Sequence, residues 1–243
     1  MEKREMKVSD HVIVCGYDGV GKNTVEELLM IGKKVMVVAP ELTAEDMEYL
    51  SEHLVGVVAG DPTEETCLKR AFIDSADTII AALPQVGNNV FIALTARDLN
   101  PDIRIIARSD QYSESTKRKF IRTGAERVVS PYVIGGYILA RAATRPYSAE
   151  FLNDALTSTY GIEINEVQVP EDGTVAGKKL DELDIKGRTG ALVVAVKLPG
   201  DDMDKTFLKN PPPDTKLVPG SWVVAIGWPK ELKLLKRLID ALE

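Results

Sequence analysis

Short apolar runs alternate with amphipathic segments over the first half of the chain. The runs are apolar at almost every position, which is typical of strands buried on both faces of a parallel sheet. The segments between them have helical spacing, and Gly32 and Thr43 are suited to end one helix and begin the next. The expected strands are 11–15, 34–40, 55–60, 76–83, 102–109 and 125–131. This alternation predicts an α/β fold, a Rossmann-like doubly wound parallel sheet with helices on both faces.

The pattern changes after Pro131. Two helical segments follow, 133–144 and 148–158, with Pro146 between them, and they predict a helix-turn-helix crossover. From Ile162 onward the chain is rich in predicted strands, and it closes with an amphipathic helix over 230–243. We therefore expect a smaller α+β C-terminal lobe. The predicted boundaries are 8–131 for the N-lobe, 132–160 for the crossover and 161–243 for the C-lobe.

Composition and charge narrow the class of protein. The 243 residues carry a net charge of −7, which argues against a nucleic-acid partner, because phosphate contacts need clustered Lys and Arg. No apolar run has the roughly 18 residues of a membrane span, and the charged first ten residues do not resemble a signal peptide. We expect a soluble, cytoplasmic protein. The isolated residues Cys15, Cys67, His11 and His53 show neither disulfide nor metal-ligand spacing.

A glycine-rich turn directly follows the first predicted strand. Dinucleotide-binding folds place the pattern G-x-G-x-x-G here, and its middle glycine lets the backbone approach a pyrophosphate. In this chain the middle position is Asp18, whose carboxylate would repel phosphate, and Ala39 stands where an acidic residue would hold a ribose. Glu41 is the nearest acidic substitute. The turn thus predicts the fold more firmly than the ligand, and its residues are Gly16, Tyr17, Asp18, Gly19, Val20 and Gly21.

Acidic residues follow several strand ends, at Asp18, Glu41, Asp61 and Asp110. Since the carboxyl ends of parallel strands share one edge, these residues could form an acidic cleft for a hard divalent cation. For Asp61 we favour a plainer role, as the N-cap of a helix over 61–73 with Pro62 in its first turn. Arg108 also ends a strand, and it could bind a phosphate or pair with one of the carboxylates.

The chain shows no arrangement typical of nucleophilic catalysis. Ser109, Ser130 and Ser221 lack a G-x-S-x-G context and a nearby histidine. With two isolated histidines, acid–base chemistry would fall to carboxylates alone. We expect the protein not to be an enzyme.

Taken together, these motifs resemble the RCK domains (regulators of K⁺ conductance, with TrkA-N and TrkA-C parts), especially those of archaeal calcium-gated potassium channels. The segments that carry the resemblance are HVIVCGYDGVG, AGDPTEETCLKRAFIDSADTIIAAL, PDIRIIARSDQYSE and TGAERVVSPYVIGGYILA, then VPEDGTVAGKKLDEL in the C-lobe. It covers residues 8 to 243. Gly220-Ser221 departs slightly from the family's Gly-Asp.

The resemblance implies a regulatory role. RCK domains dimerise through the crossover helices, which places Ile134, Tyr137, Ile138 and Phe151 at an interface. They form a homodimer and, in channels, an octameric gating ring at the inner face of the membrane. Ligand binding then opens or closes the pore. The expected partners are a second copy of the chain and a potassium-channel pore domain. The alternatives are a free-standing nucleotide-binding subunit of a Trk- or Ktr-type transporter and, more remotely, an NAD(P)-dependent oxidoreductase.

The resemblance also bears on the ligand. The family's main calcium site aligns with Ala82, Arg108 and Asp110, of which only Asp110 is acidic. Nucleotide-binding members often end the fifth strand with an arginine near phosphate, and Arg108 matches them. We expect a divalent cation, Ca²⁺, bound by Asp110 and Asp18, with ATP, ADP or NAD(H) as the alternative.

Overall fold

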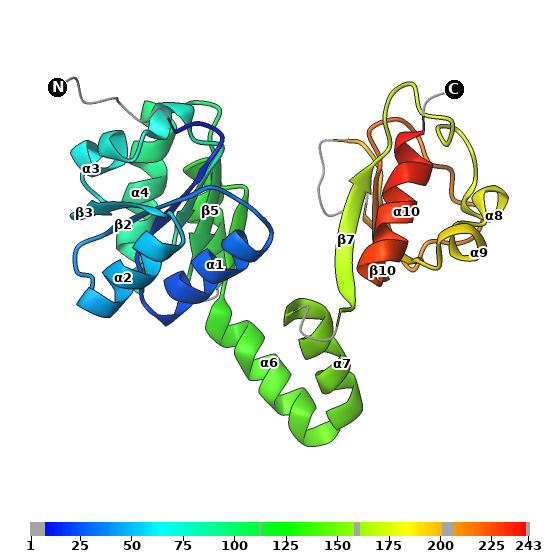
Figure 1. The fold of residues 1–243 in the computed structure, drawn as a ribbon, viewed down its shortest axis with the longest axis horizontal. Coiled ribbons are helices and arrows are strands. Elements are labelled where there is room, and N and C mark those ends of the chain that lie inside the picture. The colour runs from blue at the N-terminus through cyan, green and yellow to red at the C-terminus, as the bar shows by residue number, and fades with distance from the viewer. Residues whose placement is uncertain (1–7, 112, 158–160, 201–206, 242–243) are drawn as a thin grey trace. The chain divides into compact units, whose positions relative to one another are not determined.

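The computed structural model describes residues 8–111, 113–157, 161–200 and 207–241. The chain divides into two compact units, Met1–Ile138 and Leu139–Glu243, and the division falls within helix α6 (Pro131–Thr144). Figure 1 shows the elements of both units.

The first unit is a Rossmann-like α/β unit, as predicted. All six strands of its sheet are parallel, in the order β3-β2-β1-β4-β5-β6. The order reverses direction between β1 and β4, which is where doubly wound sheets open a crevice at their carboxyl edge. The elements are β1 (Val12–Cys15), α1 (Gly19–Met30), β2 (Val35–Ala39), α2 (Ala44–Glu52), β3 (Gly56–Ala59), α3 (Glu65–Arg70), the 3₁₀ turn η1 (Ile73–Ser75), β4 (Thr78–Ala81), α4 (Val86–Leu99), β5 (Arg104–Arg108), α5 (Glu114–Arg122) and β6 (Arg127–Val129).

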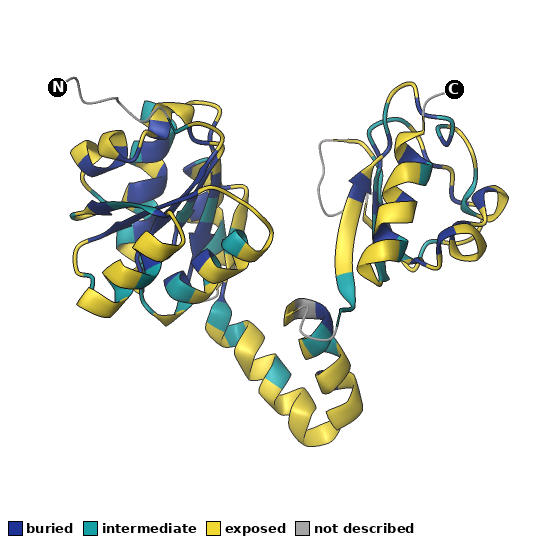
Figure 2. Cartoon of the chain, viewed as in Figure 1, coloured by how far each residue is buried: buried dark blue, intermediate teal, exposed yellow. Residues whose placement is uncertain are grey.

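Two hydrophobic clusters cover the two faces of this sheet. Successive residues of a strand point to opposite faces, so Val12 and Val14 pack with α1 and α2, whereas Ile13 and Cys15 pack with α3, α4 and α5. This explains why most positions of the strands are apolar. Figure 2 shows the sheet as a buried layer between helices with exposed outer faces.

The structure corrects the prediction of one long helix over 61–73. The helix α3 is only six residues long, and Phe72 adopts a left-handed conformation (φ 56°) before the 3₁₀ turn η1. Asp61 is not its N-cap, because that position belongs to Glu64. The Asp61 carboxylate instead accepts hydrogen bonds from the backbone N–H and the hydroxyl of Thr63, at 2.8 and 2.7 Å. This local turn competes with helix formation, so the helix begins only at Glu65.

The second unit holds an antiparallel sheet in the order β7-β10-β8-β9. Its core is formed by residues such as Val196, Leu217 and Leu235. Sequence patterns predicted three of the four strands and the final helix, but not β9 or the short helices α8 and α9. Its elements after α6 are α7 (Pro146–Thr157), β7 (Glu163–Gln168), α8 (Leu180–Leu183), α9 (Ile185–Thr189), β8 (Leu192–Lys197), β9 (Phe207–Lys209), β10 (Trp222–Gly227) and α10 (Pro229–Asp240). The predicted helix ends at 158 and 242–243 lie outside the described residues.

Candidate functional site

The glycine turn lies at the point where the strand order reverses. Gly16 follows β1 with φ +104°, a conformation that favours glycine. At Gly21, a Cβ atom would lie 2.3 Å from the carbonyl oxygen of Gly16, so this close approach of α1 to the turn excludes any side chain. The turn therefore has the tight shape that the sequence predicted, and it presents the N-terminus of α1 to the carboxyl edge of the sheet.

Asp18 is the N-cap of α1. Its Oδ1 atom accepts hydrogen bonds from the backbone N–H groups of Val20 and Gly21, each at 3.1 Å. These are among the N–H groups that a helix leaves without an intrahelical partner. A carboxylate also interacts favourably with the positive end of the helix dipole. Asp18 thus satisfies the donors that would otherwise be free to bind an external anion.

Arg108, the last residue of β5, connects this cap to the neighbouring loop. Its Nη1 atom donates to Asp18 Oδ2 at 2.7 Å and to the carbonyl oxygen of Ala82 at 3.0 Å. Its Nε and Nη2 atoms donate to the two carboxylate oxygens of Asp110, both at 2.8 Å. The Arg108 side chain is only 4% exposed, so this is a largely desolvated ion-paired triad with a bidentate arm.

The electrostatics of the triad favour its charged form. Partial burial alone would raise the pKa of Asp18, but the hydrogen bonds from Arg108, Gly21 and Val20 outweigh it and the pKa lies below its ordinary value. The hydrogen bonds that Arg108 donates to Asp110 raise the pKa of Arg108; burial opposes this rise, and the hydrogen bond donated to Asp18 adds to it. Both shifts favour the charged forms of Asp18 and Arg108 at neutral pH.

Two further residues contact Arg108, and neither was predicted. Asn89 of α4 is fully buried and exchanges hydrogen bonds with the backbone of Leu83, and its amide also donates to the Arg108 carbonyl oxygen at 2.9 Å. Tyr132 of α6 places its ring 6.0 Å from the Arg108 guanidinium carbon, at cation–π distance. A polar residue on the apolar face of a helix was the available signal for Asn89. No sequence signal distinguishes Tyr132.

The remaining candidates of the turn and the strand ends play other roles. Tyr17 is buried in the cluster beneath α1 and α2, and burial raises its pKa to about 12. Gly19 and Val20 begin α1, and Gly19 borders open space. Glu41 and Asp61 are exposed, and in the described part of the chain no hydrogen bond or ion pair joins either one to the triad. Of the four acidic residues predicted to form a cleft, the structure therefore brings together only Asp18 and Asp110, and both bind Arg108.

This arrangement bears directly on the predicted metal site. Both proposed ligands, Asp18 and Asp110, already bind Arg108. Among the described residues, no three His, Cys, Asp or Glu side chains are grouped as a metal site requires. A divalent cation could bind the two carboxylates only if the guanidinium between them moved away.

The predicted interface residues lie on α6 and α7. None of the residues of α6 is buried, although the helix is rich in apolar residues. Tyr137 is 67% exposed, Ile134 and Phe151 are about half exposed, and Ile138 is partly buried. Figure 2 shows α6 as an almost wholly exposed helix. The interface itself remains a prediction, but α6 carries exposed apolar side chains.

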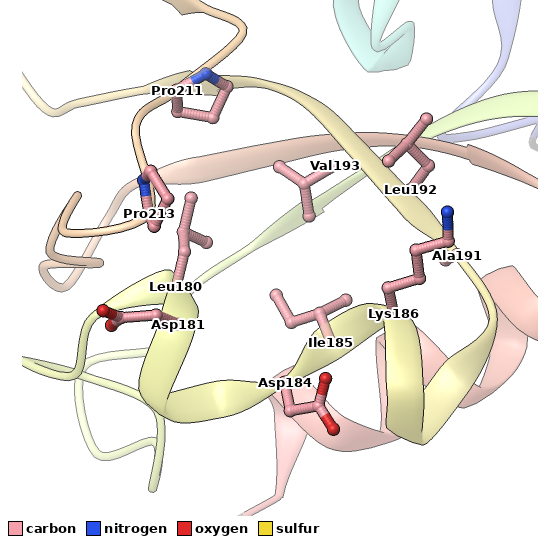
Figure 3. A pocket seen from close by; sticks show the side chains of 10 residues that line it. All are labelled: Leu180, Asp181, Asp184, Ile185, Lys186, Ala191, Leu192, Val193, Pro211 and Pro213. Atoms are coloured by element: carbon pink, nitrogen blue, oxygen red, sulfur yellow. The ribbon is translucent and has the colours of Figure 1, made fainter.

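The C-terminal unit contains a cavity that the sequence did not indicate. Its volume is about 320 Å³, and Figure 3 shows Leu180, Ile185 and Val193 pointing into it. Pro211 and Pro213 also line it. The walls come from two segments, 180–193 and 211–213, and the cavity exists only where the fold brings them together. Three charged residues, Asp181, Asp184 and Lys186, are part of the lining.

The doubly wound sheet, the glycine turn at its crevice and the separate antiparallel unit define the class: a Rossmann-type α/β protein with an appended C-terminal lobe. The TrkA-N domain matches residues 12–131 and the TrkA-C domain matches residues 164–240. The chain belongs to the RCK family, which these two domains make up.

Relatives of the chain act in potassium transport. It is 34% identical to "Probable potassium channel protein 2" of Methanocaldococcus jannaschii, over 98% of this chain and 69% of that protein. It is 26% identical to the "Trk system potassium uptake protein TrkA homolog" of Pyrococcus horikoshii, over 95% of this chain and 97% of that protein.

One solved structure shares the fold over most of the chain. The human SLO3 gating ring has a TM-score of 0.64 and 15% identity, and the match covers 92% of this chain and 44% of that one. At this identity the similarity shows the fold alone. No helix among the described residues is long and apolar enough to cross a membrane. The family and its relatives identify a regulatory domain of potassium transport.

Proposed function

We propose that this chain is the ligand-sensing gating domain of a potassium channel. It works at the cytoplasmic face of the membrane, associates with copies of itself through α6 and α7, and passes ligand binding to a pore. It carries out no reaction of its own, since its chemistry is that of a binding cleft. The triad, rather than a set of catalytic groups, occupies the carboxyl edge of the sheet.

The observation that carries this proposal is the position of Arg108. Its guanidinium contacts the cap of α1 through Asp18 and the ring of Tyr132 at the start of α6. A ligand that changes the partners of Arg108 therefore acts on the helix whose apolar surface is uncovered. Allosteric coupling needs such a contact, because a ligand shifts an equilibrium only through its different affinity for the two states.

The geometry favours a phosphate-bearing nucleotide over a divalent cation as the ligand. A cation would have to expel Arg108, which is 4% exposed and held by Asp110 and the Ala82 carbonyl as well. A phosphate would have to displace only the Asp18 side chain, which is 38% exposed. Asp18 can turn toward water, whereas a buried guanidinium cannot do so without strong cost. An adenine nucleotide or a dinucleotide is therefore the proposed ligand.

Differential thermal stabilisation tests the proposed ligand. The chain is heated with Ca²⁺, Mg²⁺, ATP, ADP, NAD⁺ or NADH, since a ligand at a hundred times its Kd stabilises the folded state by about 2.7 kcal/mol. We expect the nucleotides to raise the melting temperature and Ca²⁺ to leave it unchanged. Stabilisation by Ca²⁺ alone would contradict the nucleotide and restore the cation. Turnover of NAD(H) or NADP(H) would instead support an oxidoreductase.

A second function has support from one observation. The Pyrococcus horikoshii relative, a potassium uptake protein homolog, matches this chain over 97% of its own length. A free-standing regulatory subunit of a Trk- or Ktr-type transporter is therefore the alternative. An antibody against this chain, used on membranes of the source cells, separates the two. A much larger membrane-embedded polypeptide supports the channel, and a polypeptide of this chain's own mass supports the subunit.

A further inference from the structure

Asp18 stands where related glycine turns have their middle glycine, and its side chain fills the space that this glycine leaves free. In dinucleotide-binding folds the pyrophosphate binds at the N-terminus of the helix after the turn. Here the N–H groups of Val20 and Gly21 already donate to Asp18 Oδ1, at 3.1 Å each. The carboxylate therefore takes the donors that a bound phosphate would use.

The second oxygen of the same carboxylate engages the cation of the cleft. Asp18 Oδ2 lies 2.7 Å from Arg108 Nη1. Among the described residues, Arg108 is the basic side chain that the structure places at this cap. One carboxylate thus satisfies both anion-binding features of the cleft, the helix N-terminus and the guanidinium.

We infer that Asp18 is an internal counter-anion and the specificity-determining residue of the cleft. It competes with the phosphate of a ligand for Arg108 and for the N-terminus of α1, so a phosphate binds only when the Asp18 side chain turns away. This inference rests on the proposed nucleotide site. It explains how the chain keeps the Rossmann turn while departing from the dinucleotide pattern at its most sensitive position.

The surrounding structure does not depend on Asp18 for its shape. Arg108 keeps both bonds to Asp110 and the bond to the Ala82 carbonyl when Asp18 is removed. The backbone of Asp18 is extended, with φ −77° and ψ −172°, and any residue can adopt that conformation. Replacing Asp18 by glycine therefore frees the donors and Arg108 without reshaping the turn.

The test compares ADP and inorganic pyrophosphate binding to the wild-type chain, Asp18→Gly and Asp18→Asn by titration calorimetry. We expect Asp18→Gly to bind ADP at least about tenfold more tightly than wild type, the effect of roughly 1.4 kcal/mol of removed competition. Asp18→Asn retains a capping oxygen without the charge, so its affinity should lie between the two. It also keeps the test valid if the glycine variant does not fold. Asp102→Asn, an exposed acid before β5 at the opposite edge, controls for net charge and should bind like wild type.

The outcomes separate this inference from the proposed function. Tighter binding by Asp18→Gly than by wild type supports both. Binding by Asp18→Gly alone supports the inference but contradicts a nucleotide as the native ligand. Equal binding by wild type and both variants overturns the inference and leaves the proposed function standing. If folded wild type and folded variants all fail to bind, both are overturned.

Discussion

Arg108 is the residue through which the glycine turn, the loop after β5 and the start of α6 contact one another. The sequence indicated that Arg108 belongs to the candidate site, because it is a charged residue at the end of an apolar strand. The sequence left open whether it would bind a phosphate or a carboxylate. The structure gives it two carboxylates and an aromatic ring, because three separate segments meet at one edge of the sheet.

His11 offers a prediction at the scale of one residue. It is fully buried, its Nε2 atom lies 2.9 Å from the Ala71 carbonyl oxygen, and its Nδ1 atom has no partner in the described structure. Burial lowers its pKa below the ordinary value of 6.5, with a further contribution from the charge of Lys34. The unfolded chain therefore binds a proton more readily than the folded chain below pH 6.5, so this histidine makes stability fall as the pH decreases from there.

We expect His11→Gln to remove this part of the pH dependence, which is at most about 1.4 kcal/mol per pH unit. Glutamine can still donate to the Ala71 carbonyl but does not titrate. The measurement is the free energy of unfolding in urea at pH 7.5 and 5.5 (about one unit on either side of 6.5). His53→Gln changes an exposed histidine and should leave the wild-type difference intact. The same pH dependence in His11→Gln as in wild type would rule out His11 as its source.

At the scale of elements, α1 and α2 are both followed by a residue in the left-handed conformation, but the residue types differ. Gly32 follows α1 with φ +75°, as its sequence position predicted, and Leu54 follows α2 with φ 55°. Both donate a backbone hydrogen bond across the last turn. A left-handed conformation suits glycine but costs a leucine about 1 kcal/mol or more. The Leu54 side chain is 93% exposed, so no packing offsets this cost.

Leu54→Gly is therefore expected to stabilise the N-lobe, by about 0.5–1 kcal/mol after the greater flexibility of glycine in the unfolded chain is subtracted. Thermal unfolding followed by circular dichroism measures the change. Leu54→Ala keeps a Cβ atom and should have little effect. Equal stability of the glycine and alanine variants would mean that the left-handed backbone at this position carries no cost.

The helix over 61–73 shows where element prediction fails. Its apolar spacing is helical, but Asp61 bonds to Thr63 in a local turn and Phe72 takes a left-handed conformation. Phe72 cannot be recognised in advance, because a non-glycine residue of this kind disfavours the left-handed conformation. Thr43, by contrast, was correctly predicted as an N-cap, and Asp46 completes a reciprocal capping box with it.

At the scale of the whole molecule, the exposed apolar side chains of α6 predict self-association. Tyr137 and Ile134 contribute large exposed apolar area, and tyrosine is enriched among the residues that dominate binding energy at interfaces. We expect the wild-type chain to be a dimer or a larger assembly by light scattering. Tyr137→Glu should weaken this association at least about tenfold, the effect of roughly 1.4 kcal/mol.

Leu54→Glu is the matched control for this experiment, since it places the same charge at an exposed apolar position of the first unit away from α6. It should leave the assembly unchanged. A monomeric wild-type chain, or a Tyr137→Glu variant with undiminished association, would contradict an interface on α6.

The sequence by itself determined the architecture of this protein. Apolar periodicity and the glycine pattern predicted the six strands of a doubly wound sheet, the turn after the first strand and the change to a strand-rich C-terminal lobe. These features depend on local spacing and on which residues avoid water. Only the tertiary structure decided what the cleft is. Asp18 lies 90 residues before Arg108 in the chain, and their ion pair forms only because the ends of β1 and β5 meet at one edge of the sheet. Electrostatic pairing depends on distance in space, which no local pattern records.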